Sequence, residues 1–338
     1  MSKFEEILRT IESSDYLSRK DSKFAFNFIL EGKANENQIE NFLLGLVKKG
    51  ETLDDIISGV SVLRDKSIKV EIPNNAIDTC GTGGDKAGTY NISTAAIFVA
   101  AGAGCIIAKH GNKALSSKSG SSQVLEELGV NINISPENIA NCIKESNIGF
   151  MFAPNHHSAM KYVGPVRQKL EVRTIFNILG PLVNPGNVKK QLIGVYDKKW
   201  LIPLTKVLSE LGSERAMLVC GSDGLDEITT TGISYITELK DEKITSYEID
   251  PKDFGIKISS SNDLIGGSPK ENANKILRLL NGEDGPFKDI VVLNSAAAIY
   301  VSGIANNIEE GLKLANESLN NRKAEQSLFK LIEASNAK

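Results

Sequence analysis

From about residue 77, short apolar runs alternate with helix-like segments, and this alternation limits the fold more than any other feature of the chain. Apolar runs of strand length lie at 106–108, 149–152, 192–195, 216–219 and 290–293. Helices are expected at 94–102, 121–128, 136–146, 201–211 and 269–281. Strand, helix and strand in succession favour an α/β fold, with a mostly parallel central sheet flanked by helices. The polar, alternating segment 239–262 predicts peripheral hairpin strands.

The first 67 residues have a helical pattern instead. Phe4, Ile7, Leu8 and Ile11 share one face of a first helix. A second helix should stop at Gly32, and a third should run from Asn35, with Gln38 at the capping-box position, to about Gly50. Thr52 can cap a fourth helix that buries Leu53, Ile56, Ile57, Val60 and Leu63. The sequence therefore predicts a small all-α domain ending near Ser67, ahead of the α/β domain.

Composition excludes several classes of protein. The net charge of −3 argues against broad nucleic-acid affinity, which requires a basic surface. Four cysteines without a CxxC pair favour reduced thiols in a cytoplasmic setting. The longest apolar run, residues 95–108, is too short and too rich in glycine to span a bilayer, and the first helix is amphipathic, unlike a signal peptide.

Two polar clusters flank that apolar run, and both are suited to a ligand. The segment DTCGTGGDKAGTYNIST, residues 78–94, sets four glycines and Asp85 among hydroxyl side chains. Glycine lets backbone N–H groups approach a phosphate closely. The segment KHGN, residues 109–112, combines a cation, an imidazole and an amide. In a parallel sheet both clusters would lie beyond the carboxyl ends of strands, where ligands bind, so we expect a site for a polyanionic small molecule.

Each of these motifs has a plainer interpretation. The glycine segment is neither a Walker loop nor a GxGxxG loop and could be a tight turn. Lys109 and His110 could be a surface lysine and a hydrogen-bonded core histidine. The stretch 111–122 could be a flexible polar loop or, before a helix, a second anion cradle.

Three further features bear on chemistry. His156 and His157 precede a predicted amphipathic helix that carries Lys161, Arg167, Lys169 and Arg173. A metal at the tandem histidines is disfavoured, since adjacent side chains point to different faces. Arg167 could bind a substrate carboxylate or be a solvated helix arginine. Asp226 and Glu227 follow the strand expected at 216–219, which places them near the same rim as the glycine segment. They could hold Mg²⁺ bound to diphosphate, or form a solvated turn.

Taken together, the motifs resemble those of anthranilate phosphoribosyltransferases. They occur in the family's order: GTGGD, NIST, KHGN, SKSGSSQVLEELG, FAPNHHSAMKYVGPVR, RTIFNILGPLVNP, GSDGLDE and LNSAAAIYVSG. The match runs from about Phe4 to the C-terminus. It implies a nucleoside phosphorylase-like architecture and a homodimer formed through the helical domain. It also implies transfer of phosphoribosyl from 5-phosphoribosyl 1-diphosphate to the amine of anthranilate, in L-tryptophan biosynthesis, with Mg²⁺.

The resemblance also implies domain limits and site residues. The helical domain would comprise 1–67, with helices of about 156–185 packing on it, and the α/β domain 68–338. The donor would be surrounded by Gly81, Gly84, Asp85, Thr89, Asn91, Ser93, Thr94, Lys109, Asn112, Ser117 and Ser121. Anthranilate would be lined by Gly81, His110, Asn112, His157 and Arg167, with Pro181 at the wall of its tunnel. Mg²⁺ would be engaged by Ser93, Asp226 and Glu227.

Two positions depart from the family's pattern: Gln123 stands where many members have an acid, and Cys220 where many have histidine. No residue is assigned as the general base, because the lone pair of an aniline is already available at neutral pH. Two other functions fit parts of the sequence. A nucleoside phosphorylase would share the fold and the anion loop, and a non-catalytic paralogue would bind nucleic acid or a protein instead. The string RTIFNILGPLVNP opposes the first, and the retained motifs with the acidic charge oppose the second.

Overall fold

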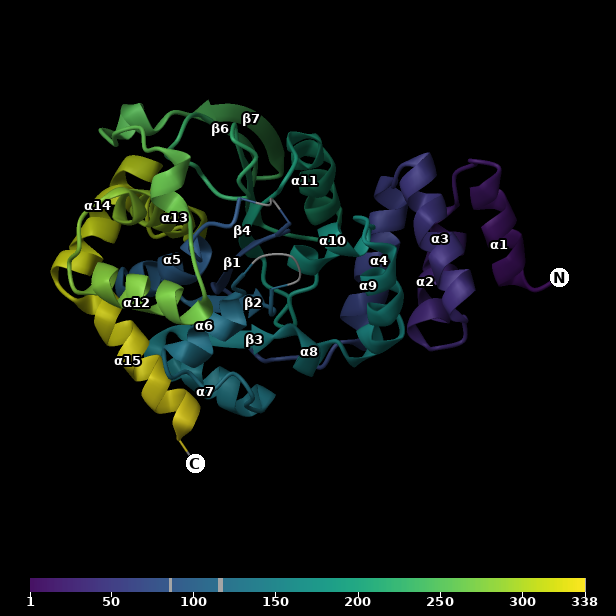
Figure 1. Cartoon of the computed structure of the whole chain (residues 1–338), viewed down its shortest axis with the longest axis horizontal. Helices are drawn as coiled ribbons and strands as arrows, with labels where there is room; N and C mark the ends of the chain where they lie inside the picture. The colour runs from purple at the N-terminus through teal and green to yellow at the C-terminus, as the bar shows by residue number, and fades with distance from the viewer. Residues whose placement is uncertain (85–86, 115–117, 338) are drawn as a thin grey trace. The chain divides into compact units, whose positions relative to one another are not determined.

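The computed structural model describes residues 1–84, 87–114 and 118–337. It divides into two compact units. The helical unit comprises Met1–Ile68 and Pro154–Asn187, and the sheet unit comprises Lys69–Ala153 and Val188–Lys338 (Figure 1). Among the described residues, no helix combines the length and apolar character needed to cross a membrane.

Four helices near the N-terminus form most of the helical unit. They are α1 (Lys3–Glu12), α2 (Arg19–Leu30), α3 (Glu36–Lys49) and α4 (Leu53–Lys66). Short helical segments follow later in the chain: α8 (Ala153–His156), η1 (Ser158–Tyr162), α9 (Gly164–Leu170), α10 (Phe176–Leu179) and η2 (Gly180–Leu182). The four predicted helices are confirmed, and Asn35 caps α3 in a capping box with Gln38 as predicted. Leu53, predicted to be buried, is 37% exposed because it occupies the first position of α4, before the helix meets its neighbours.

The sheet unit is built on seven strands in the order β3-β2-β1-β4-β5-β6-β7 (Figure 1). The strands are β1 (Ile77–Gly81), β2 (Ile107–Gly111), β3 (Ile148–Phe152), β4 (Lys190–Gly194), β5 (Arg215–Gly221), β6 (Ser234–Lys240) and β7 (Lys243–Ile249). The first five pair in parallel, whereas β6 and β7 form an antiparallel hairpin at one edge. The predicted mostly parallel sheet is confirmed. Because β1 lies between β2 and β4, the strand order reverses at β1, which is where such sheets bind ligands.

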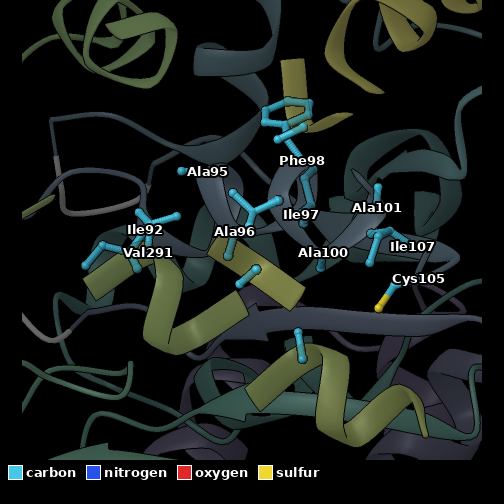
Figure 2. Close-up of a cluster of buried hydrophobic side chains, with 14 of the residues drawn as sticks. Ile92, Ala95, Ala96, Ile97, Phe98, Ala100, Ala101, Cys105, Ile107 and Val291 are labelled. Atoms are coloured by element: carbon cyan, nitrogen blue, oxygen red, sulfur yellow. The ribbon is translucent and has the colours of Figure 1, made fainter. Parts of the chain in front are cut away.

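The helices of the sheet unit pack on the sheet or on one another. They are α5 (Ile92–Gly102), α6 (Ser121–Glu127), α7 (Pro136–Ser146), α11 (Leu201–Glu210), α12 (Pro269–Leu280), α13 (Pro286–Ser302), α14 (Ile308–Asn320) and α15 (Lys323–Asn336), with short turns η3 (Lys198–Trp200), η4 (Pro251–Phe254) and η5 (Ser261–Leu264). The main core forms where α5 packs against α13 and α15. Figure 2 shows Ile92, Ala96 and Ile97 of α5 in this core, together with Val291 of α13.

Three predicted elements are wrong or misplaced. Residues 290–293 are not a strand but the middle of α13, which starts with Pro286 and ends at Gly303 in the left-handed conformation. The helix is buried almost all round, so its apolar run has no helical period to distinguish it from a strand. The central strand β1 is missing from the predicted set, since it contains polar Asp78 and Thr79. The hairpin exists but spans Ser234–Ile249, and residues 250–262 lie beyond it.

Candidate active site

The glycine-rich segment connects β1 to α5 in the sheet unit. Gly81 ends β1, and Asn91 occupies the N-cap position of α5 without capping it through its side chain. The Asn91 amide bonds the next loop instead: its Nδ2 donates to the carbonyl of Ser119 over 3.2 Å, and its Oδ1 accepts from the Ser119 hydroxyl over 3.1 Å. Asn272 of α12 donates to the same Oδ1 over 2.8 Å. The amide therefore ties the two polar loops together beside the N-terminus of α5.

Two carboxylates from the loop after β5 reach the glycine segment. We call residues 222–231 the acid loop. The backbone N–H of Gly83 donates to Oδ2 of Asp226 over 2.7 Å, and the backbone N–H of Ser93 donates to Oε1 of Glu227 over 3.0 Å. The expectation that Asp226 and Glu227 lie at the same rim as the glycine segment is confirmed. Glu227 thus places negative charge at the N-terminus of α5, where the helix dipole favours it.

Glycines on two neighbouring strands make this approach possible. Gly81 of β1 pairs in register with Gly194 of β4. A Cβ added at Gly81 would lie 2.3 Å from Oδ2 of Asp226, and one at Gly194 would lie 1.6 Å from the Asp226 carbonyl oxygen. The acid loop therefore packs directly on the backbone of both strand ends.

Lys109 brings a buried cation to the same place. Its side chain is only 2% exposed, and its ammonium group donates to the carbonyl of Thr79 and, over 3.4 Å, to the hydroxyl of Ser93. Next to it, the backbone N–H of His110 donates to Oδ1 of Asp78 over 3.1 Å. Lys109, Asp226 and Glu227 therefore all bond the glycine segment that leads into α5. One cation and two carboxylates at a helix N-terminus suit a ligand that carries both phosphates and a metal ion.

The loop after β2 is held by its own polar groups. Asn112 accepts from the Ser121 hydroxyl through its carbonyl oxygen over 3.3 Å. Gln123 of α6 accepts from the backbone N–H groups of Ala114 over 3.3 Å and Gly120 over 3.1 Å. Gln123, which stands where an acid was expected, thus accepts both N–H groups through a neutral amide oxygen.

Of the other residues predicted to bind the phosphoribosyl donor, the structure describes Thr89, Thr94 and Gly84. Thr89 forms an antiparallel bridge with Ile265, and the Thr94 hydroxyl is buried without a hydrogen bond to a described residue. Gly84 has a φ of 73°, in the left-handed region that favours glycine. Asp85 and Ser117 lie outside the described residues.

The helical unit contributes its own candidate residues. His157 is 6% exposed, and the Arg167 guanidinium lies over the Phe176 ring, 5.7 Å from the ring centroid. Among the described residues, no hydrogen bond or ion pair holds that guanidinium, and burial lowers its pKa. A half-buried arginine stacked on an aromatic ring is preorganised to receive a carboxylate. Pro181 is buried in η2.

The expectation of one amphipathic helix here is wrong. The 3₁₀ turn η1 ends at Tyr162, and α9 covers Gly164–Leu170, ending because Glu171 adopts a left-handed φ of 51°. Arg173 lies beyond it.

His156 has a structural role, since its Nδ1 lies 2.9 Å from the carbonyl oxygen of Ile68. Burial lowers the pKa of His156, which favours its neutral ring.

The side chains expected to hold the metal ion have the chemistry that a hard cation requires. Asp226, Glu227 and Ser93 offer oxygen atoms, which Mg²⁺ prefers. Throughout the described ranges, no cluster of three or more His, Cys, Asp or Glu side chains is arranged for a metal ion. A small protein ligand set is typical of Mg²⁺, which keeps waters and binds substrate phosphates. Burial and the nearby Asp197 raise the pKa of the Cys220 thiol to about 11, which favours its protonated form.

Three residues of the site were not found from the sequence. The buried Asn272 bonds Asn91, which lies 181 residues away in the chain. The buried Asn294 of α13 bonds the backbone of Ile228, which lies 66 residues away. Gly194 lies in an ordinary apolar strand, and nothing local distinguishes it. The one available signal was that each asparagine interrupts the apolar face of a predicted or actual helix.

Comparisons with known proteins agree with this geometry. Residues 73–325 match the glycosyl transferase family, a/b domain, and residues 5–67 match the glycosyl transferase family, helical bundle domain. An anthranilate phosphoribosyltransferase from Rhizobium meliloti is 48% identical over 337 residues, which cover 100% of both chains. One from Agrobacterium fabrum is 45% identical, covering 99% of this chain and 98% of the relative.

Solved structures give the same result. The crystal structure of anthranilate phosphoribosyltransferase from Thermus thermophilus superposes with a TM-score of 0.92 at 34% identity, covering 98% of this chain and 99% of the other. The enzyme from Saccharomyces cerevisiae, solved in complex with PRPP and Mg, has a TM-score of 0.90 at 27% identity and covers 98% of this chain and 97% of its own. Identity near one half over the full length, the shared fold and the preserved order of motifs lead to one conclusion: the chain belongs to the anthranilate phosphoribosyltransferase family.

Proposed function

We propose that this protein transfers the phosphoribosyl group of 5-phosphoribosyl 1-diphosphate to the amine of anthranilate, giving N-(5-phosphoribosyl)anthranilate and diphosphate. The observation that carries the proposal is the convergence of Lys109, Asp226 and Glu227 on the glycine segment at the N-terminus of α5. Such a site matches a donor that carries a diphosphate and needs a divalent cation.

The chemistry follows from these residue types. The bond between C1 of the ribose and the diphosphate oxygen breaks, and its electron pair leaves with the diphosphate. Positive charge develops on the ribose, and the lone pair of the anthranilate nitrogen forms the new bond to C1, after which the nitrogen loses a proton. The Lys109 ammonium and the backbone N–H groups of the glycine segment stabilise the growing charge on the leaving group. Holding the amine in line with C1 supplies further acceleration.

We propose that Asp226, Glu227 and Ser93 hold Mg²⁺. When bound, the ion supplies positive charge that neutralises the diphosphate. The two carboxylates already accept hydrogen bonds from the glycine segment, so they are oriented before a ligand arrives. The yeast relative was solved in complex with PRPP and Mg, which supports the choice of ion.

For the donor we propose Gly81, Gly84, Asp85, Thr89, Asn91, Ser93, Thr94, Lys109, Asn112, Ser117 and Ser121. For anthranilate we propose Gly81, His110, Asn112, His157 and Arg167. We also propose a cytoplasmic homodimer formed through the helical domain of residues 1–67, acting in L-tryptophan biosynthesis. Residues 68–338 would form the donor-binding domain, except that the helices of about 156–185 pack on the helical domain.

Replacing Arg167 with Ala should raise the KM for anthranilate roughly 10- to 100-fold and that for the donor much less. A hydrogen-bonded pair of charges contributes about 1.5–3 kcal/mol, and Arg167 is proposed to meet the anthranilate carboxylate. Steady-state kinetics with each substrate varied in turn measure the effect. Lys169→Ala, on the same helix, is the control, since its exposed ammonium pairs with Glu40 over 3.2 Å. An unchanged anthranilate KM in Arg167→Ala would reject the role.

The direct test of the function is the loss of anthranilate fluorescence on mixing with protein, donor and Mg²⁺. Decay that requires donor and metal together is the expected result. No decay, with the donor still raising the Tm of the protein, would mean that the acceptor is not anthranilate. No decay and no Tm shift would reject the transferase.

A further inference from the structure

Asn294 of α13 holds the acid loop at the residue directly after Glu227. Its Nδ2 donates to the Ile228 carbonyl over 2.8 Å, and its Oδ1 accepts from the Ile228 N–H over 2.9 Å. Nδ2 also donates to the carbonyl of Ile290, one helical turn earlier, over 2.9 Å. Asn294 is 1% exposed and Ile228 is fully buried. Both backbone groups of Ile228 are thus satisfied by one side chain in a place without water access.

Apart from the bonds of the two carboxylates, the acid loop is attached toward its ends. Asp223 accepts from the Thr229 hydroxyl over 2.8 Å and from the Thr231 hydroxyl over 2.6 Å. The Thr229 N–H donates to the Ser234 hydroxyl over 2.9 Å. These bonds close the loop on itself or on β6, and the Thr230 carbonyl accepts a further bond from the N–H of Ser259, after β7, over 2.9 Å. The Asn294 bonds differ because they link the loop to a long buried helix of the core.

The helix is a rigid reference point for the acids. α13 packs against α5, whose N-terminus receives Glu227 through the Ser93 N–H. The acid pair is therefore fixed from two sides: α5 and the glycine segment bond the carboxylates, and α13 bonds the backbone behind them. A change at Asn294 would alter the position of the carboxylates without touching any ligand.

We propose that Asn294 is a positioning residue for the metal site, setting where Asp226 and Glu227 present their carboxylates. The inference rests on the proposed function, in which these two acids hold Mg²⁺. Groups that orient metal ligands from behind typically change metal affinity or activity by about 10- to 100-fold when they are removed.

The test is Mn²⁺ binding in place of Mg²⁺, measured by the electron paramagnetic resonance signal of free Mn²⁺ in the presence of 5-phosphoribosyl 1-diphosphate. Asn294→Leu keeps the approximate volume and removes every hydrogen bond, so we expect Mn²⁺ affinity to fall about 10-fold or more. Asn294→Ser leaves room for water and keeps the test valid if the leucine variant does not fold. Ser295→Ala is the matched control, because this buried hydroxyl of the same helix bonds Val291 and Ala96 and not the acid loop.

A folded Asn294 variant with the wild-type Mn²⁺ affinity would overturn the proposal. The variant Asp226→Asn with Glu227→Gln is measured beside it to separate the two claims. If that variant has lost Mn²⁺ binding while the Asn294 variants have not, the positioning role alone fails. If it binds Mn²⁺ like the wild type, the metal assignment fails and the positioning role fails with it.

Discussion

Asp226→Asn combined with Glu227→Gln should lower kcat/KM by roughly 10³-fold and abolish the normal Mg²⁺ dependence, since metal and charge stabilisation contribute several kcal/mol to such transition states. The amides retain an oxygen for the N–H groups of Gly83 and Ser93, so the loop contacts survive while two negative charges are lost. The effect should therefore report on the metal rather than on folding.

The measurement is initial rate against Mg²⁺ concentration at saturating substrates. Glu248→Gln is the matched control, because it makes the same change at an exposed position of β7. A wild-type Mg²⁺ titration curve in the double variant would show that these acids do not hold the ion.

Gly194→Ala is expected to lower kcat/KM about 100-fold or more, through one methyl group. The added Cβ would lie 1.6 Å from the carbonyl oxygen of Asp226, a backbone atom that cannot turn away as a side chain does. The acid loop must move away from the end of β4, and this movement displaces Asp226 from its hydrogen bond to the Gly83 N–H. Overpacking of this kind also costs about 1–3 kcal/mol of stability.

Kinetics at 25 °C and a thermal melt together separate the two effects. Gly164→Ala is the control, since a Cβ there meets nothing within 4 Å. If Gly194→Ala retained wild-type activity and Tm, the close contact between β4 and the acid loop would not exist in solution.

Local signals in the sequence predicted much of the fold. Asn35 with Gln38, and Thr52 with Asp55, are capping pairs three residues apart, so the helix starts are set by neighbours in the chain. The meeting of Lys109 with the glycine segment also followed, because the carboxyl ends of adjacent parallel strands share one edge. Prediction failed where the local signal was ambiguous. The apolar run at residues 290–293 is compatible both with a buried strand and with the middle of a buried helix, and it forms part of a helix.

The contacts of Asn294, Asn272 and Gly194 with distant residues could not be predicted. Asn294 bonds Ile228, which lies 66 residues away in the chain, and Asn272 bonds Asn91, which lies 181 residues away. No repeating pattern in the sequence indicates contacts at such separations. The need for glycine at Gly194 depends on where the Asp226 carbonyl arrives, which only the folded chain determines. Such residues respond to the tertiary position of a loop, and a single sequence does not encode that position locally.

The paired glycines at the ends of β1 and β4 also restrict how this chain can evolve. Every other amino acid carries a Cβ, so any codon change that alters Gly81 or Gly194 places an atom where Asp226 already lies. The constraint is stricter at Gly194, which meets a backbone atom, than at Gly81, which meets the end of the Asp226 side chain. Gly83 and Gly88 have open space around them, and they favour glycine for another reason, their positive φ angles of 65° and 62°. An alternative residue at either strand end would therefore require the acid loop itself to move, so a change there would have to be accompanied by changes in residues 222–231.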